Sequence, residues 1–416
     1  MFILFGLALT VGLIWFVMAA PLGRRSVGAS VLVDCAAERV WRALYPFGAD
    51  AGWNGAIAHV RPLDGDARTG RIVTAHEGRD GKPIERDFAL EDVVAPHGFR
   101  MRYTADSALD QSHWRNHRYE VAIAPLPGGR CRVMLCETDT YRGAAFFVFR
   151  FFALRRMAGK LKIWAETGRF VKGGVFERPS TQLAMAGVSA LLLWPLFGLD
   201  AFGLFLSATL TAVVALHELG HMAAFRLMGH RSARMIFIPV LGGLALGGRP
   251  YDTRFEVGFA ALMGAGFSAF LAATLMAAHS LLAAGLEPLH ARALVVIALI
   301  CALFNLGNLA PVWKFDGGQV IRQLFASRLG QGVAASTLLI CMVATGIALG
   351  VPLHLMLVAG LVIAVLSVMT AGNGVRPKRP LTAMSGAERV AIAAGLAAVS
   401  LTHAAVLVWS VGLLFA

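Results

Sequence analysis

Eight apolar stretches, each close to the length needed to cross a lipid bilayer, constrain the fold of this chain more than any other feature. A membrane-spanning helix needs about 20 mostly apolar residues, and lipid admits only helices and closed barrels as spanning structures. The stretches are residues 2–20, 182–199, 202–228, 256–284, 291–311, 333–350, 352–371 and 388–415. The sequence therefore predicts a polytopic α-helical membrane protein with about eight spans, interrupted by a soluble segment from about residue 26 to 175.

Composition and charge support a membrane protein. The chain has 416 residues, of which 57% are hydrophobic and only 15% are charged, against about 25% charged residues in soluble domains. The net charge of +13 comes from basic residues that cluster beside the apolar stretches. This placement is typical of topogenic charge and of attraction to the headgroups of membrane lipids, and we therefore expect no nucleic-acid partner.

The basic clusters predict one orientation. Arg24 and Arg25 follow the first stretch, and pairs of spans return the chain to further basic residues near Arg226, Arg322 and Arg376. All these clusters lie on one side, as the positive-inside rule requires. We expect an uncleaved N-terminal anchor in a bacterial inner (plasma) membrane, with the soluble segment and the active-site side facing the cytoplasm. The five cysteines are scattered and odd in number, which disfavours a disulfide framework.

The soluble segment has the pattern of an α+β domain. A strand at Ser30–Val33 and a short helix at Ala36–Tyr45 are followed by apolar alternations broken by Gly and Asp, and then by a long helical pattern from about Gly143 to Phe170. The alternating runs are Ile57–Leu63, Gly70–His76, Phe88–Val94, Phe99–Tyr103, Arg118–Ala124 and Arg130–Thr138. Such runs predict antiparallel strands.

This segment resembles the START-like (SRPBCC) superfamily, a helix-grip fold. The resemblance rests on the opening strand, the Ala37–Leu44 helix with Trp53 after it, the Pro125–Val133 turn and strand, and the helix end Leu161–Glu166. It implies a hydrophobic small ligand held between the sheet and the long helix. An ordinary packed α+β domain without a ligand is the alternative reading.

The strongest chemical signal is the run His217-Glu218-Leu219-Gly220-His221. On a helix, residues i and i+4 share a face, so both imidazoles can reach one metal ion, and the Glu beside the first His can act as a general base. The run ends an apolar stretch, where ionisable residues are costly and usually functional. A structural pair of histidines at a helix end is the alternative reading.

A third ligand is available in Asp316, which follows another apolar stretch on the same side of the membrane. A catalytic zinc site has three protein ligands and an open position. His217, His221 and Asp316 would supply that set for one Zn²⁺ per chain. The two glycines after Asp316 are expected to let the backbone turn tightly there.

The two motifs together resemble the site-2 protease family of intramembrane zinc metalloproteases. The pattern is HExxH at residue 217 and N-x-x-P-x-x-x-x-D-G-G from Asn308 to Gly318. The resemblance implies that His217, His221 and Asp316 bind the metal, that Glu218 is the general base, and that Asn308 binds the substrate backbone or the oxyanion. Two departures put substrate positioning in doubt. The Gly-Pro-x-x-Asn stretch of the family is replaced by Met263–Ser268, with Ser268 as a substitute polar group, and Trp313 lies where a second Pro is often found.

The expected organisation is an anchor at 1–22, a START-like domain at 26–175, a protease core at 180–372 and a C-terminal helix at 385–416. The Gly-rich apolar run 237–248 is too short to span and is expected to form a membrane-embedded hairpin whose strand edge pairs with substrate. A cytoplasmic loop is the alternative.

The predicted function is an intramembrane endopeptidase that cleaves transmembrane segments of membrane-protein substrates in regulated intramembrane proteolysis. The alternatives are a non-proteolytic lipid-sensing or scaffold protein with a retained metal site, and a transporter with an ion path through His and Asp.

Overall fold

The computed structural model describes residues 12–415, apart from 13–14, 17–18, 64, 79–81, 171–177, 231–232, 239–241, 248, 355, 358–359 and 362–379. The chain divides into two compact units. An N-terminal unit comprises Met1–Gly174 with Gly372–Pro380, and a helical unit comprises Val175–Ala371 with Leu381–Ala416. Each unit has apolar clusters of its own.

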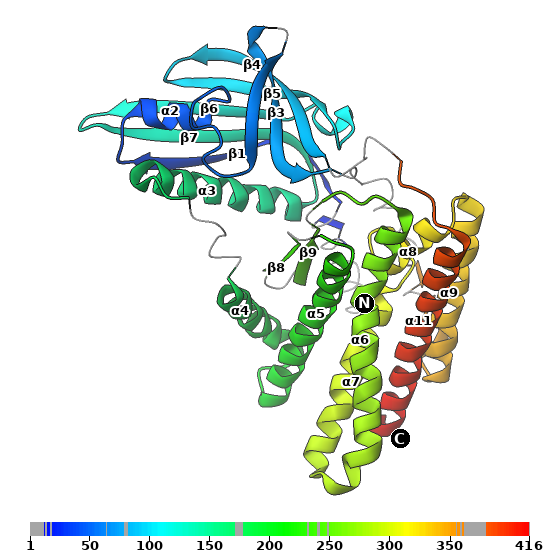
Figure 1. The fold of residues 1–416 in the computed structure, drawn as a ribbon. Helices are drawn as coiled ribbons and strands as arrows, with labels where there is room; N and C mark the ends of the chain where they lie inside the picture. Colours follow the sequence, from blue (N-terminus) through cyan, green and yellow to red (C-terminus); the bar gives the residue numbers. More distant parts are fainter. Residues whose placement is uncertain are drawn as a thin grey trace. The chain divides into compact units, whose positions relative to one another are not determined.

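The N-terminal unit is built on a seven-stranded antiparallel sheet in the order β1-β7-β6-β5-β4-β3-β2. Its elements are β1 (Pro21–Val33), α2 (Ala37–Leu44), β2 (Ile57–Leu63), β3 (Asp66–Glu77), β4 (Pro83–Val94), β5 (Gly98–Asp106), the short helix η1 (Gln111–His113), β6 (Arg118–Leu126), β7 (Arg130–Arg142) and α3 (Ala144–Thr167). Sequential strands pair with each other from β2 to β7, and the first strand joins the last. Figure 1 shows this sheet with α3 running along it.

The long helix α3 covers the sheet with one apolar face. Its buried residues Leu154, Ala158, Leu161 and Ala165 recur at helical spacing. They pack into one cluster with alternate residues of the strands, such as Val133. A sheet of this topology gripped by a long C-terminal helix confirms the expected helix-grip architecture of this unit.

The strand boundaries extend the sequence expectations. β1 begins at Pro21 rather than Ser30, so Arg24 and Arg25 lie in a strand opposite Thr140 and Asp139 of β7. They were expected to flank a membrane anchor, whose residues lie largely outside the described part of the chain. Their exposed side chains are explained by the edge position of β1 in the sheet, because polar residues are favoured on a solvated strand face.

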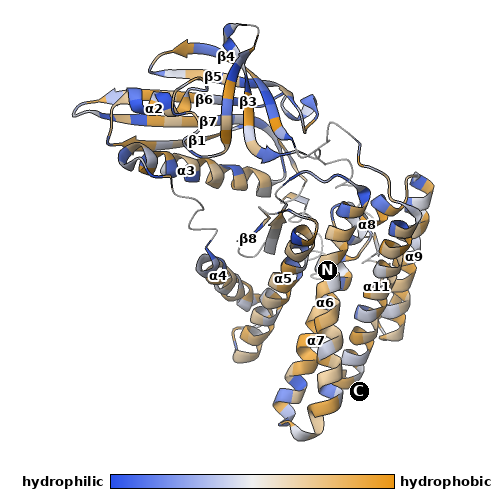
Figure 2. Ribbon diagram, viewed as in Figure 1, coloured by the Kyte–Doolittle hydropathy of each residue, from blue (hydrophilic) through white to orange (hydrophobic). Residues whose placement is uncertain are grey.

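Among the described residues, six helices of the helical unit are long and apolar enough to cross a membrane. They are α4 (Pro179–Phe197), α5 (Ala201–Leu227), α6 (Arg254–Leu282, extended to Gly285 by the short helix η3, Ala283–Gly285), α7 (Pro288–Asn308), α9 (Arg328–Ala348) and α11 (Gly386–Phe415). Figure 2 shows their apolar colouring, most continuous along α6, α7 and α11. The other two expected spans, at 2–20 and 352–371, lie largely outside the described residues.

Two short elements complete the helical unit. The strands β8 (Arg234–Ile238) and β9 (Gly242–Leu246) pair antiparallel, in the part of the chain expected to form a hairpin. Helix α8 (Asp316–Leu324) follows α7 and packs on α6 through Val320 and Leu324. The last helix, α11, packs within the same unit, because Val406 and Leu407 share an apolar cluster with α6 and α7.

Candidate metal centre

Helix α5 carries both histidines of the site. It begins at Asp200, whose carboxylate accepts a hydrogen bond from the Gly203 backbone N–H at 2.6 Å, and it remains helical through the HExxH run. His217 and His221 therefore lie one turn apart on one face. Their Nε2 atoms are 3.1 Å from each other, and both rings are largely buried.

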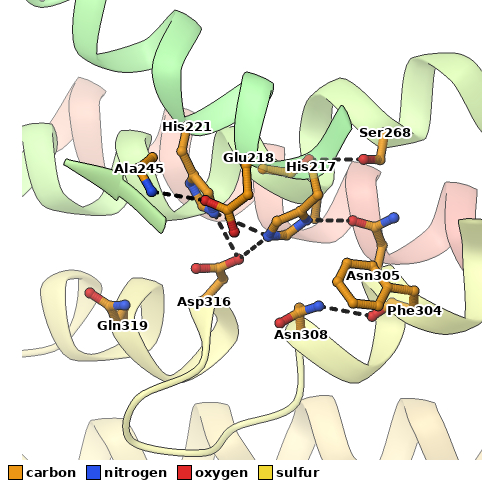
Figure 3. Close-up of polar contacts among 12 residues, drawn as sticks. His217, Glu218, His221, Ala245, Ser268, Phe304, Asn305, Asn308, Asp316 and Gln319 are labelled. Carbon is orange, nitrogen blue, oxygen red and sulfur yellow. Dashed lines mark hydrogen bonds and ion pairs between the residues drawn. The ribbon is translucent and has the colours of Figure 1, made fainter. Parts of the chain in front are cut away.

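Asp316 reaches the same point from a different element. It is the first residue of α8, where the helix dipole favours a carboxylate. Its Oδ2 atom lies 3.0 Å from Nε2 of His217 and 3.4 Å from Nε2 of His221. Figure 3 shows the three side chains pointing toward one another. The structure thus brings together three side chains that the sequence motifs predicted as metal ligands, across about a hundred residues of chain.

The outer nitrogens of the two imidazoles are held by acceptors. Nδ1 of His221 is 2.7 Å from the carbonyl oxygen of Ala260, on α6. Nδ1 of His217 is 2.8 Å from Oδ1 of Asn305, on α7. The amide orientation of Asn305 is fixed because its Nδ2 donates to the carbonyl of Cys301 at 2.8 Å. Both Nδ1 atoms therefore donate, so each neutral imidazole would direct its Nε2 lone pair toward Asp316, whereas a protonated imidazole would donate from Nε2 to that carboxylate.

These lone pairs fit a bound cation. Two unprotonated nitrogens and a carboxylate oxygen would repel one another at 3.0–3.4 Å, unless a positive charge lies between them. Ligands at about 2.0–2.1 Å in tetrahedral zinc coordination lie roughly 3.3 Å apart, close to these separations. His217, Glu218 and His221 also form a group able to hold a metal ion, with ligand atoms within 4.8 Å of one another. We favour Asp316 as the third ligand because its Oδ2 lies 3.0 Å and 3.4 Å from the two Nε2 atoms, whereas Glu218 accepts a hydrogen bond from Ala245.

Glu218 lies beside the ligands but is held by the hairpin. Its Oε2 accepts a hydrogen bond from the backbone N–H of Ala245, in β9, at 3.0 Å. A Cβ atom added at Gly243, two residues earlier in β9, would lie 3.0 Å from Cβ and Cδ of Glu218. The hairpin therefore fixes the Glu218 carboxylate at the edge of the site, where a general base could act.

Small residues let the helices approach at the site. A Cβ atom added at Gly264, on α6, would lie 2.7 Å from Nε2 of His217 and 2.6 Å from Cε1 of His221. One at Gly220 would clash with the carbonyl of Met263. Glycine at both positions is therefore required for α5 and α6 to pack as closely as they do.

The two glycines after Asp316 act differently from the sequence expectation. Both lie inside α8, and neither has a positive φ. They are needed because the loop from α7 lies directly on the helix start. A Cβ atom at Gly317 would overlap the carbonyl of Leu309, and one at Gly318 would overlap that of Val312. In the same loop, Trp313 stacks under the Arg322 guanidinium at 4.0 Å from the ring centre, which ties the loop to α8.

Asn308 and Ser268, the polar residues expected to position substrate, have other hydrogen-bond partners in the structure. Asn308 donates to the carbonyl of Phe304 in its own helix at 3.1 Å, and Figure 3 shows it apart from the two imidazoles. Ser268 is buried and donates to the carbonyl of Gly264 at 3.1 Å. A substrate role for Asn308 stays a prediction. Asn305, which does contact a ligand, was missed, although an amide inside an apolar stretch is a signal that could have found it.

The N-terminal unit contains a cavity of about 250 Å³ between its sheet and helices. Its wall is mixed, with apolar residues such as Phe99 and Met157 beside polar ones such as Arg150 and His117. Nε of Arg150 and Nδ1 of His117 are buried, and neither has a hydrogen-bond partner among the described residues.

No protein-family model and no curated protein matches the chain. Among solved structures, a START superfamily protein from Mycobacterium smegmatis shares 15% identity over 33% of this chain and 96% of its own, with a TM-score of 0.24. The Aha1 dimer from Colwellia psychrerythraea shares 11% identity over 36% of this chain and 99% of its own, with a TM-score of 0.27. A protein from Deinococcus radiodurans shares 16% identity over 35% of this chain and 100% of its own, with a TM-score of 0.25.

Proposed function

We propose that this protein is an intramembrane zinc-dependent endopeptidase that cleaves transmembrane segments of other membrane proteins, as in regulated intramembrane proteolysis. The observation that carries the proposal is the convergence of His217, His221 and Asp316 within 3.4 Å of one another, with Glu218 alongside. These ionisable groups lie on or next to helices apolar enough to span a membrane, where such groups are usually functional.

The donor set fits zinc, which takes nitrogen and carboxylate ligands with one position left open in catalytic sites. His217, His221 and Asp316 would hold the ion. When bound, zinc supplies a Lewis acid that polarises a carbonyl and makes water acidic enough to attack near neutral pH. Asn305 and the Ala260 carbonyl keep the imidazoles oriented. Glu218 takes the proton of the attacking water and returns it to the leaving amine.

The hairpin offers a place for the substrate backbone. Because the Ala245 N–H donates to Glu218 rather than to β8, Ala245 and Gly243 belong to the edge of β9 that faces the site. An unwound, extended substrate segment would add to this edge as a strand. Its peptide bonds would then run past Glu218 and the metal ligands.

The cavity in the N-terminal unit supports a second proposed activity. We propose that this unit binds a small amphipathic ligand that regulates the protease. The cavity is slightly smaller than the roughly 300–1,000 Å³ of drug-sized pockets. The buried, unpartnered Nε of Arg150 calls for a hydrogen-bond acceptor on an otherwise apolar ligand. Binding of a fluorescent medium-chain fatty acid should weaken in Arg150→Met and persist in Arg132→Met. Equal binding by both variants would remove this part of the proposal.

The orientation is part of the proposal as well. We place the N-terminal unit and the open side of the metal site at the cytoplasmic face of a bacterial inner membrane. The reason is the positive-inside rule, because Arg226, Arg234 and Arg322 follow the ends of apolar segments that we expect on that side. Cysteine labelling of intact cells at these segments tests this placement.

The decisive experiment compares wild type with Glu218→Gln, purified in detergent, for bound zinc and for cleavage of a panel of single-span proteins. We expect zinc in both and cleavage by wild type alone, with a loss of at least about 10²-fold in rate. Glu287→Gln, in the exposed turn before α7, is the matched control and should cleave normally. Zinc without cleavage by either protein would favour a lipid sensor or scaffold. Cleavage by the variant would show that Glu218 is not the base.

A further inference from the structure

Another buried histidine lies on α11, close to the part of α6 that borders the candidate metal site. His403, in α11, is fully buried, and its Nε2 is 3.0 Å from the carbonyl oxygen of Ala265, on α6. A carbonyl only accepts, so Nε2 carries the proton. Nδ1 is buried without a hydrogen-bond partner among the described residues. A histidine with a single hydrogen bond is costly in an apolar helix bundle, which calls for a function.

The carbonyl that His403 holds belongs to the part of α6 that forms one wall of the site. Ala265 directly follows Gly264, where an added Cβ atom would overlap the Nε2 atoms of His217 and His221. One turn earlier, the Ala260 carbonyl accepts from Nδ1 of His221. The position of α6 along its own axis therefore decides whether the imidazoles fit over Gly264 and whether His221 keeps its acceptor.

Two further contacts between α6 and α11 near the site are apolar. Gly395 of α11 faces Leu262 of α6, and Val399 faces Gly266. Apolar contacts are not directional, so they hold the helices together without fixing their register. A hydrogen bond with defined donor and acceptor positions does fix it.

We propose that His403 is a positioning residue for the metal centre. Its Nε2–H bond to the Ala265 carbonyl sets the register of α6 against α11, and thereby where Gly264 and the Ala260 carbonyl lie for His217 and His221. This inference rests on the proposed metal site but not on proteolysis, so it can be tested by metal binding alone.

The test uses substitutions that differ in reach. The amide nitrogen of Gln lies the same number of bonds from Cα as imidazole Nε2, whereas that of Asn lies one bond closer. His403→Gln can therefore restore the donor to Ala265, and His403→Asn cannot. His279→Leu is the control, because it removes another α6–α11 contact, the ring pair His279–Trp409 at 5.3 Å between centroids, at the end of α6 away from Gly264.

The full-length variants are titrated with Co²⁺ in detergent, with affinity measured by chelator competition and ligand geometry by visible absorption. We expect His403→Asn to bind roughly tenfold more weakly with an altered spectrum, in line with the loss of outer-shell support at metal sites, and His403→Gln and His279→Leu to behave as wild type. The thermal midpoint of each metal-free variant separates loss of register from loss of fold.

Each outcome decides the question. Wild-type binding by His403→Asn, or equal weakening by His403→Gln or His279→Leu, would overturn the positioning role. Failure of wild type to bind Co²⁺ would overturn it together with the metal centre. The predicted changes in Co²⁺ binding without any substrate cleavage would leave His403 in its role and count against the protease.

Discussion

Gly264 lies on α6 directly against both ligating imidazoles, and no side chain fits there. A methyl group at this position would come within 2.7 Å of Nε2 of His217, which is shorter than any ordinary carbon–nitrogen contact. Gly266, two residues further along α6, has room for a side chain. A Cβ atom added there would lie 3.7 Å from Val399 and 3.9 Å from Met263. The two glycines therefore offer a matched pair of substitutions.

We expect Gly264→Ala to lose most zinc binding, because the added methyl displaces the imidazoles. Gly266→Ala, with the same loss of glycine flexibility and the same gain in volume, should bind zinc like wild type. Zinc content of the purified proteins measures both. Normal zinc binding by Gly264→Ala would mean that the ligands lie elsewhere.

Asn305 and Asn308 are neighbours on α7 with different partners, and their substitutions should separate two functions. Asn305→Leu removes the acceptor for His217 Nδ1, so we expect metal affinity to fall by about 10- to 100-fold. Asn308→Leu loses only a bond within its own helix and should bind metal normally. If Asn308 contacts substrate, cleavage alone would fall. A drop in metal affinity for Asn308→Leu and none for Asn305→Leu would reverse these assignments.

Among the elements, the β8–β9 hairpin is the one that we propose connects the metal site to a substrate. Strand β9 passes Glu218 so closely that Gly243 has no space for a side chain on that face, and Ala245 holds the carboxylate. The hairpin itself is anchored to α5 and α4 rather than to the metal ligands. A change in β9 should therefore affect the base and leave the metal in place.

We expect Gly243→Ala to retain zinc and to lose cleavage by at least about tenfold, because the methyl group pushes Glu218 from its position. This result is the opposite of that for Gly264→Ala, which should lose the metal itself. Parallel assays of zinc content and single-span substrate cleavage distinguish them. Loss of zinc in Gly243→Ala would place β9 among the metal-supporting elements instead.

At the scale of the whole molecule, the two units should respond to different perturbations, since their cores are separate. In the N-terminal unit, burial lowers the pKa of His117 to about 4, with Arg150 and other nearby positive groups adding to the effect. A histidine whose pKa falls on folding destabilises the fold when it is protonated. Its stabilising contribution is therefore complete above about pH 6.5 and is lost as the pH falls toward 4.

We expect His117→Gln to protect the N-terminal unit against this acid loss by about 3 kcal/mol at pH 4 relative to pH 7. Burial raises the pKa of Glu137 and of Asp139, so these carboxyls act in the opposite direction, and the difference between the two proteins isolates His117. Hydrogen exchange of strand β6 in the full-length protein, measured across this pH range, follows the effect. Equal loss of protection in both proteins would contradict the assignment.

Local sequence patterns predicted the helices and strands and the types of side chain at the candidate metal site. The alternation of apolar and polar residues predicted β2 with its observed bounds, Ile57–Leu63. The lengths of the apolar stretches predicted the six long apolar helices. Helical spacing placed His217 and His221 on one face. These features follow from interactions within a few residues along the chain. The start of β1 at Pro21 was missed because its pairing with β7 lies more than a hundred residues away.

The tertiary structure alone decided which side chains meet. The sequence motif singled out Asn308 rather than Asn305, which is three residues earlier, yet the packing of α7 on α5 turns Asn305 toward His217. The same holds for the space at Gly264, the carbonyls over Gly317 and Gly318, and the contact of His403 with Ala265. Such contacts depend on helix register and interaxial distance, which arise from the packing of the whole bundle rather than from any one segment.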